Sequence, residues 1–187
     1  MSYPTRIPLF TAPTPIEFLS RASARLGVRI HVKRDDLTGA ALGGNKARKL
    51  EFLAADAEAS GSDVWITCGA VLSNHCRATA YAARRLGRDV HLLLMGRPPA
   101  AAAGNFWVDR MLGATVEFLT PDEYRERRVH LRRAAERFSA LGRRPYVIPE
   151  GGSNAVGTFG YIEAMREIGA QRSETVGDFN AIVCAAG

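Results

Sequence analysis

Residues 43–51 read Gly-Gly-Asn-Lys-Ala-Arg-Lys-Leu-Glu, and residues 73–75, one expected strand later, read Ser-Asn-His. The first stretch places Lys46 at the start of a helix, directly after glycines that let a planar group approach the backbone closely. A lysine that forms a Schiff base must lose its proton, and a helix N-terminus and low exposure both disfavour the ammonium form. The same N-termini attract phosphate groups and oxyanions. The pattern therefore indicates a site around Lys46 for an anionic molecule that carries a carbonyl group.

Strands and helices alternate along the chain outside this stretch, and most of the strands are apolar on both faces. This order is typical of an α/β fold in which parallel sheets are covered by helices on both sides. We expect strands at residues 28–34, 63–68, 89–95, 115–119, 146–149 and 180–186, and helices at residues 46–60, 74–86, 104–112, 120–141 and 159–169.

Capping signals mark three of the helix starts. Asn45 and Ser73 each precede an expected helix and are good N-cap residues. Thr120 and Glu123 form a capping box, with Pro121 at the first helical position. For Ser73 a capping role and a chemical role are compatible.

The composition is that of an ordinary globular protein. With 187 residues and 47% apolar content, the chain can bury a substantial core. The net charge of +6 comes largely from arginines within residues 125–137, where glutamates and apolar residues recur at helical spacing. That segment indicates a solvated helix face, and we expect no nucleic-acid partner because no recognition motif or aromatic cluster accompanies the charge.

The cysteines and the apolar runs of the sequence indicate the cellular compartment. The three cysteines are odd in number and show no C-x-x-C spacing, so we expect neither a disulfide framework nor a metal site. The first residues lack the apolar core of a signal peptide, and the longest apolar runs, such as residues 91–95, are too short to span a membrane. We therefore expect a cytoplasmic protein with no membrane partner.

Several short motifs follow one another along nearly the whole chain. They are residues 33–39 (Lys-Arg-Asp-Asp-Leu-Thr-Gly), 44–46, 48–51, 73–75, 104–105, Asp109, 113–114, 151–153, Gly157 and 160–161. In this order they resemble the D-cysteine desulfhydrase and 1-aminocyclopropane-1-carboxylate deaminase group of pyridoxal-phosphate enzymes. The resemblance implies the tryptophan synthase β-like architecture (pyridoxal-phosphate fold type II), with pyridoxal 5′-phosphate as cofactor.

The resemblance also implies a role for individual residues. Lys46 would hold the cofactor as a Schiff base, with Asn45 beside it and Asn74 bonded to the 3′-oxygen of the pyridoxal ring. Ser73 would handle the substrate as a nucleophile or proton-transfer group, and His75 would help to bind it. The alternatives from the residues alone are a solvated lysine, two capping side chains and a partly buried histidine.

A domain arrangement follows from the same resemblance. Residues 50–158 would form a small α/β domain, while residues 1–49 and 159–187 would belong to a larger cofactor domain. In the family, the strand at residues 180–186 leads into the glycine-rich loop that cradles the cofactor phosphate. We therefore expect that this chain corresponds to the amino-terminal half of such an enzyme, and that an intact member is a homodimer.

Two features leave the substrate open. Leu72 stands where the family usually has glutamine, which removes a polar side chain from the substrate end of the cleft. The Asn74-His75 pair favours D-cysteine desulfhydrase, which releases pyruvate, sulfide and ammonia. The alternatives are 1-aminocyclopropane-1-carboxylate deaminase, which yields 2-oxobutanoate and ammonia, and a non-catalytic fragment or association module. A Rossmann-type nucleotide binder is excluded because no G-x-G-x-x-G turn joins a strand to a helix.

Overall fold

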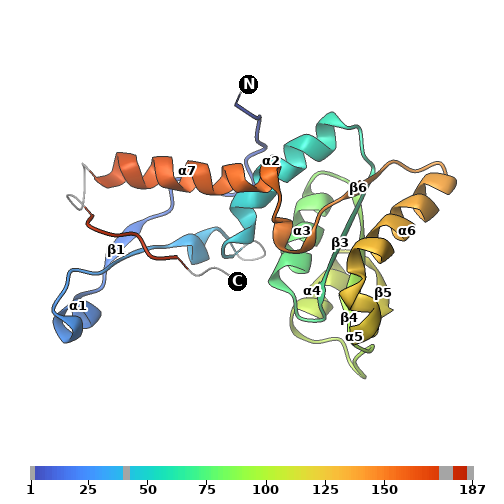
Figure 1. Ribbon diagram of the computed structural model, residues 1–187, viewed down its shortest axis with the longest axis horizontal. Helices are drawn as coiled ribbons and strands as arrows, with labels where there is room; N and C mark the ends of the chain where they lie inside the picture. The colour runs from blue at the N-terminus through green and yellow to red at the C-terminus, as the bar shows by residue number, and fades with distance from the viewer. Residues whose placement is uncertain (1–2, 40–42, 173–178, 185–187) are drawn as a thin grey trace.

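The computed structural model describes residues 3–39, 43–172 and 179–184. Figure 1 shows two regions side by side: one contains a twisted sheet with its helices, and the other contains α1, β1 and most of α7. The helices α2 and α7 lie where the two regions meet, and they pack against each other. The helices are α1 (Ser20–Leu26), α2 (Lys46–Ala59), α3 (Asn74–Arg85), α4 (Gly104–Met111), α5 (Pro121–Arg125), α6 (Arg127–Ala140) and α7 (Ala155–Gln171), with 3-10 turns η1 (Asp35–Leu37) and η2 (Glu150–Gly152).

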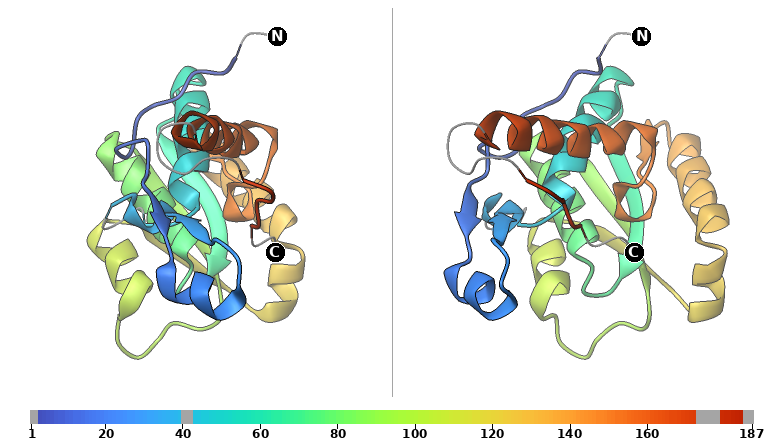
Figure 2. Two further views of the ribbon diagram at one scale, coloured as in Figure 1. Left: turned by 90° about the vertical axis from the view of Figure 1, so that its left-hand side faces the viewer. Right: turned by 60° about the vertical axis from the view of Figure 1, so that its left-hand side comes forward.

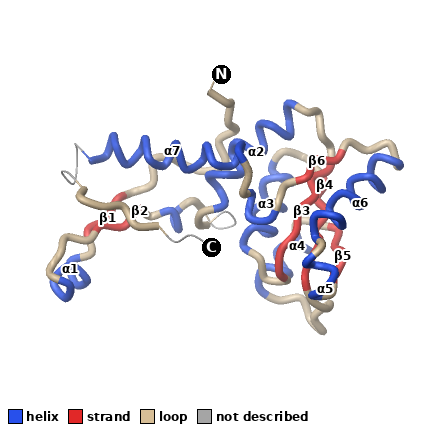
Figure 3. The backbone as a smooth tube through the Cα atoms, viewed as in Figure 1, coloured by secondary structure: helices blue, strands red, loops and turns tan. Residues whose placement is uncertain are grey.

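The main sheet has four strands in the order β5-β4-β3-β6. All of them are parallel, as the sequence pattern predicts. The central strand β3 is buried along nearly its whole length, so its residues are apolar or small on both faces. Figure 3 shows these four strands gathered in one part of the molecule, apart from β1 and β2. Their bounds are β3 (Val64–Ala70), β4 (Asp89–Met95), β5 (Thr115–Leu119) and β6 (Pro145–Val147).

Helices cover both faces of this sheet, which completes the expected three-layer arrangement. On one face, Trp65 and Leu92 pack with the alanine-rich side of α3 and with α2. On the other face, Ile66 and Leu93 pack with Leu131 of α6. Figure 2 shows α6 on the side of the sheet away from α3 and α4. Among the described residues, every helix is too short or too polar to cross a bilayer.

A second, two-stranded sheet lies apart from the first and is antiparallel, which the sequence pattern did not predict. It pairs β1 (Ile16–Phe18) with β2 (His31–Lys33), and α1 lies between them in the chain. The strand expected at residues 28–34 is therefore real but shorter, since only three of its residues find partners on β1.

Three other expected boundaries are corrected. The helix expected at residues 120–141 breaks at Glu126, whose ψ is 25°, and this break lets α5 and α6 contribute Tyr124 and Leu131 to one apolar cluster. The last helix begins at Ala155, because the Asn154 side chain caps it by accepting a hydrogen bond from Gly157 N at 2.8 Å. Residues 180–184 form no strand, since none of the described strands pairs with them, and residues 185–186 lie outside the described residues.

Candidate functional site

The residues singled out in the sequence gather at the carboxyl ends of β3 and β6. From β3 the chain proceeds through α3 to β4 on one side, whereas β6 lies on the other side of β3, so the strand order reverses between β3 and β6. Ligands of open α/β sheets bind outside the carboxyl ends of strands at such a switch point. Residues 71–75 leave β3 at this point, residues 148–153 leave β6, and α2 contacts both α3 and η2.

Lys46 is the first residue of α2 and is half-buried. Its Nζ donates a hydrogen bond to Asn45 Oδ1 at 2.8 Å. Asn45 occupies the N-cap position, but its side chain does not cap the helix and binds Lys46 instead, which corrects the expected capping role. Burial, and then the positive charge of Lys49, lowers the pKa of Lys46, so the neutral amine that a reaction with an aldehyde requires forms at lower pH than in an exposed lysine.

Lys49 is a second cation at the site that the sequence reasoning missed. Its Nζ donates to the Gly151 carbonyl at 3.2 Å and to Ser153 Oγ at 2.9 Å. Gly151 has a positive φ of 68°, and a Cβ on Gly152 would lie only 3.0 Å from Leu53, so the turn needs glycine to lie against α2. The three-residue spacing from Lys46 was the available signal, because it places both lysines on one helix face.

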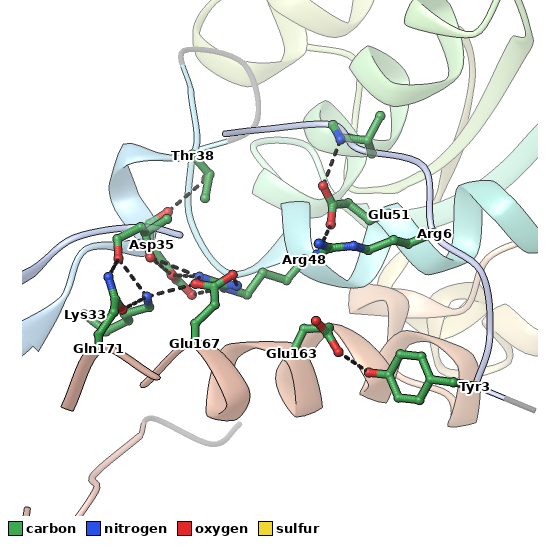
Figure 4. A network of polar contacts seen from close by, with 12 residues as sticks. Tyr3, Arg6, Lys33, Asp35, Thr38, Arg48, Glu51, Glu163, Glu167 and Gln171 are labelled. Carbon is green, nitrogen blue, oxygen red and sulfur yellow. Dashed lines mark hydrogen bonds and ion pairs between the residues drawn. The ribbon is translucent and has the colours of Figure 1, made fainter. Parts of the chain in front are cut away.

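Arg48 anchors the same helical turn from below. Its side chain is 1% exposed and binds two carboxylates through paired bonds of 2.8–2.9 Å, one from Asp35 and one from Glu167 of α7. Figure 4 shows the guanidinium between these carboxylates, with Lys33 on the far side of Glu167. Burial opposes the charge of Glu167, but the bonds from Arg48 and Lys33 outweigh it and hold the pKa of Glu167 below its usual value. Lys46 thus begins a helix that is fixed to α7 by a buried ionic network.

Ser73 and Asn74 lie at the start of α3. Ser73 Oγ accepts a hydrogen bond from Cys76 N at 3.2 Å, which confirms its capping position. A Cβ on Gly69 would lie 2.6 Å from Ser73 Oγ and 2.8 Å from Cys76 Sγ, so glycine at the end of β3 is what allows this turn to close. Asn74 is exposed and Ser73 is partly exposed, so both polar groups remain accessible beside the end of β3.

His75 lies in the interior, beneath these accessible groups. Its side chain is 4% exposed, and its Nε2 lies 2.8 Å from the Thr67 hydroxyl, which donates in turn to the Ile148 carbonyl. Burial, with the charges of Lys46 and Lys49, lowers the pKa of His75 to about 3 and keeps the imidazole neutral. Direct contact of His75 with a substrate stays a prediction.

A separate cavity of about 600 Å³ lies between β1, β2, the end of α7 and residues 179–183. Neither Lys46 nor Ser73 nor Asn74 lines it. Within the described ranges, no group of three or more His, Cys, Asp or Glu side chains could hold a metal ion.

The protein is an α/β protein with a parallel sheet, and a half-buried lysine lies at the switch point of that sheet. Such a site suits a negatively charged ligand that carries a carbonyl group. The family model described as "Pyridoxal-phosphate dependent enzyme" matches residues 7–187, and the chain belongs to this family. The family's cofactor is pyridoxal phosphate, and the residues at the site fit such a group: two lysines, one of them with a lowered pKa, and the exposed amide of Asn74.

Relatives and solved structures support the same assignment. The chain is 44% identical over 188 residues to a D-cysteine desulfhydrase of Salmonella choleraesuis, covering 97% of this chain and 56% of the relative. It is 43% identical over 182 residues to a Pyrococcus horikoshii protein that carries the provisional name 1-aminocyclopropane-1-carboxylate deaminase, and the match covers 97% of this chain and 54% of the relative. A crystal structure described as an ACC deaminase homologue superposes with a TM-score of 0.84 at 42% identity, covering 90% of this chain and 51% of that one. The chain therefore spans about half the length of the relatives it matches, and its fold is that of the tryptophan synthase β-like, fold type II enzymes.

A more distant structure shares the fold alone. A fungal L-serine ammonia-lyase from Rhizomucor miehei superposes with a TM-score of 0.69 at 18% identity, covering 89% of this chain and 49% of that one.

Proposed function

We propose that this chain provides the lysine-bearing part of a pyridoxal-phosphate-dependent lyase that acts on a small amino acid. The observation that carries the proposal is the half-buried Lys46 with its lowered pKa, which lies beside Lys49 and near enough to His75, in the first turn of α3, for its charge to lower the pKa of that histidine. When bound, pyridoxal phosphate supplies an electron sink for charge that develops on the substrate.

The residues of the chain divide the work around that cofactor. Lys46 would hold it covalently, and the positive charge of Lys49 would attract its phosphate. The amide of Asn74, with Asn45 near Lys46, would orient the ring. The hydroxyl of Ser73 is accessible enough to accept or return a proton at the substrate.

For the substrate we favour D-cysteine, which with one water would yield pyruvate, hydrogen sulfide and ammonia. The relatives named D-cysteine desulfhydrase and the Asn74-His75 pair support this choice. The relatives named for 1-aminocyclopropane-1-carboxylate deaminase support that compound as the second candidate. Leu72 is 62% exposed, so an apolar side chain borders the accessible groups where a glutamine is usual.

The domain division is part of the same proposal. Residues 50–158 contain the four-stranded sheet with its covering helices, and residues 1–49 and 159–187 would form part of the cofactor domain. Lys46 belongs to residues 1–49 and the start of α3 to residues 50–158, so this division would place the site where the two domains meet. A homodimeric assembly is expected for the intact enzyme.

Titration of the purified chain with pyridoxal phosphate tests the proposal. We expect a saturable visible absorbance band that borohydride abolishes, and complete loss of that band in Lys46→Ala. The control is Lys49→Arg, which removes the neighbouring amine but keeps its positive charge, and it should retain the band. Lys33→Ala is not used as a control because it would break the ion pair between Lys33 and Glu167. The absence of a band, or a band that persists in Lys46→Ala, would refute the proposal and favour a non-catalytic fragment or association module.

The pH dependence of this reaction provides a second test. Lys49→Met removes a positive charge that lowers the pKa of Lys46, so the pKa of Lys46 should rise. At any pH below that value less neutral amine is present, and borohydride trapping of pyridoxal at Lys46 should slow and require a higher pH. The measurement is the trapping rate against pH, with Lys49→Arg as the variant that keeps the charge. Equal profiles for the Met and Arg variants would show that Lys49 does not tune Lys46.

A further inference from the structure

The side-chain amide of Asn105, in the first turn of α4, has hydrogen-bond partners at both its oxygen and its nitrogen. Its Oδ1 accepts from Arg77 Nη1 at 2.9 Å. Its Nδ2 donates to the Leu72 carbonyl at 2.7 Å and to Asn74 Oδ1 at 2.9 Å. A guanidinium can only donate and a backbone carbonyl can only accept, so Arg77 and Leu72 together leave one orientation for this amide.

The orientation of Asn105 decides that of Asn74. Because Asn105 presents its NH₂ group, the atom of Asn74 that faces it must be the amide oxygen. The NH₂ group of Asn74 then remains as a free donor, without a hydrogen bond to any described residue, on an exposed side chain. A reversed Asn74 would present an acceptor instead.

Arg77 is held toward α4 by charge as well as by its hydrogen bond. Asp109 lies one helical turn after Asn105, is fully buried, and has no hydrogen-bond partner for either carboxylate oxygen within the described residues. Burial raises the pKa of Asp109 to about 7, and the nearby charge of Arg77 opposes that rise. The attraction between the two groups favours the position of Arg77 in which it meets Asn105.

We propose that Arg77 and Asn105 are positioning residues that hold the Asn74 amide with its NH₂ group toward the 3′-oxygen, the oxygen attached to the pyridine ring of pyridoxal phosphate. That oxygen carries negative charge, which an N–H donor stabilises and a carbonyl oxygen repels. The inference rests on the proposed function, in which Asn74 contacts this oxygen. Asn105 also binds the Leu72 carbonyl, so the same amide steadies the loop that ends at Ser73.

Asn105→Asp is the decisive variant. Aspartate keeps the shape of asparagine and its bond to Arg77, and a negative charge near the start of α4 is compatible with the helix. It offers no donor to Asn74 or to the Leu72 carbonyl, so Asn74 must rotate its amide and donate its NH₂ group to the new carboxylate. We expect pyridoxal phosphate binding to weaken on the order of 10- to 100-fold, as for the loss of one hydrogen bond to a charged group.

A double-mutant cycle separates positioning from a general effect of the new charge. In an Asn74→Ala background, Asn105→Asp should weaken pyridoxal phosphate binding clearly less than in the parent chain, because no amide remains to be turned and only the bond to the Leu72 carbonyl is lost. An equal weakening with and without Asn74 would overturn the proposal.

An NMR measurement on the chain without cofactor tests the positioning of Asn74 separately from the proposed function. In the unloaded chain labelled with ¹⁵N-asparagine, Asn105→Asp should shift the NH₂ protons of Asn74 downfield and slow their exchange with water. Unchanged Asn74 signals would overturn the inference even if cofactor binds. A clear shift of the Asn74 signals without any loss of pyridoxal phosphate affinity would overturn the role of Asn74 toward the 3′-oxygen. The proposed function is tested separately, by the absorbance band at Lys46.

Discussion

Arg48→Met is expected to lower the free energy of unfolding of this chain by about 3–5 kcal/mol, the range for removing one partner of a buried ionic network. The substitution leaves the carboxylates of Asp35 and Glu167 facing each other without the guanidinium that binds both. Lys33 can still pair with Glu167, but Asp35 loses its two bonds to Arg48. Urea denaturation followed by circular dichroism measures the loss.

The matched control is Arg132→Met on α6. Arg132 is 69% exposed and lies 3.9 Å from Glu136, so the same substitution there removes only a solvated ion pair and should be nearly neutral. Similar midpoints for the two variants would mean that the network in Figure 4 contributes little to folding.

Gly160→Ala is expected to destabilise the chain by about 1–3 kcal/mol or more through overpacking, although alanine is the better helix former. At this position α7 crosses α2, and a Cβ would lie 2.4 Å from the carbonyl carbon and oxygen of Arg48 and 2.7 Å from Lys49 N. These are backbone atoms, so no side-chain rotation can relieve the clash. The helices must separate, which shifts the turn that carries Lys46 and should also weaken pyridoxal phosphate binding.

Gly169→Ala is the control on the same helix. A Cβ there meets nothing within 4 Å, so alanine should stabilise the chain by roughly 0.5–1 kcal/mol through helix propensity. Thermal unfolding of both variants gives the comparison. A loss of stability at Gly169 equal to that at Gly160 would show that the close approach of α7 to α2 is not the cause.

The central part of the fold was predictable because local signals agreed with one another there. The strands β4 and β5 have the expected bounds, and α2, α3 and α4 each match to within a residue at either end. Apolar runs separated by glycine-ended helices allow little choice in that region. The capping box at Thr120 also formed as expected, because it depends only on residues three apart.

Elsewhere, contacts between distant segments decided the outcome. Helix α7 includes Gly157 and Gly160, which argue against a helix locally, yet a Cβ on either would collide with η2 or α2. The strand at residues 16–18 carried little signal of its own and exists because β2 pairs with it. Asn45 is a residue type that commonly caps helices, but its side chain accepts a hydrogen bond from the Lys46 ammonium instead of capping α2.

The sequence by itself determined the family and the parallel α/β architecture, and it selected Lys46, Ser73 and Asn74 as candidate site residues, because each inference rests on residue types at short spacing. Only the tertiary structure decided how those residues are tuned. Elements that are far apart in sequence supply the contacts of Lys49 with Gly151 and Ser153, the burial of His75 and the bonds of Asn105 to Arg77 and Asn74. Burial, with the charge of Lys49, lowers the pKa of Lys46, and the hydrogen bond from Asn105 of α4 fixes which atom of the Asn74 amide faces α4, so both depend on the packing of the folded chain.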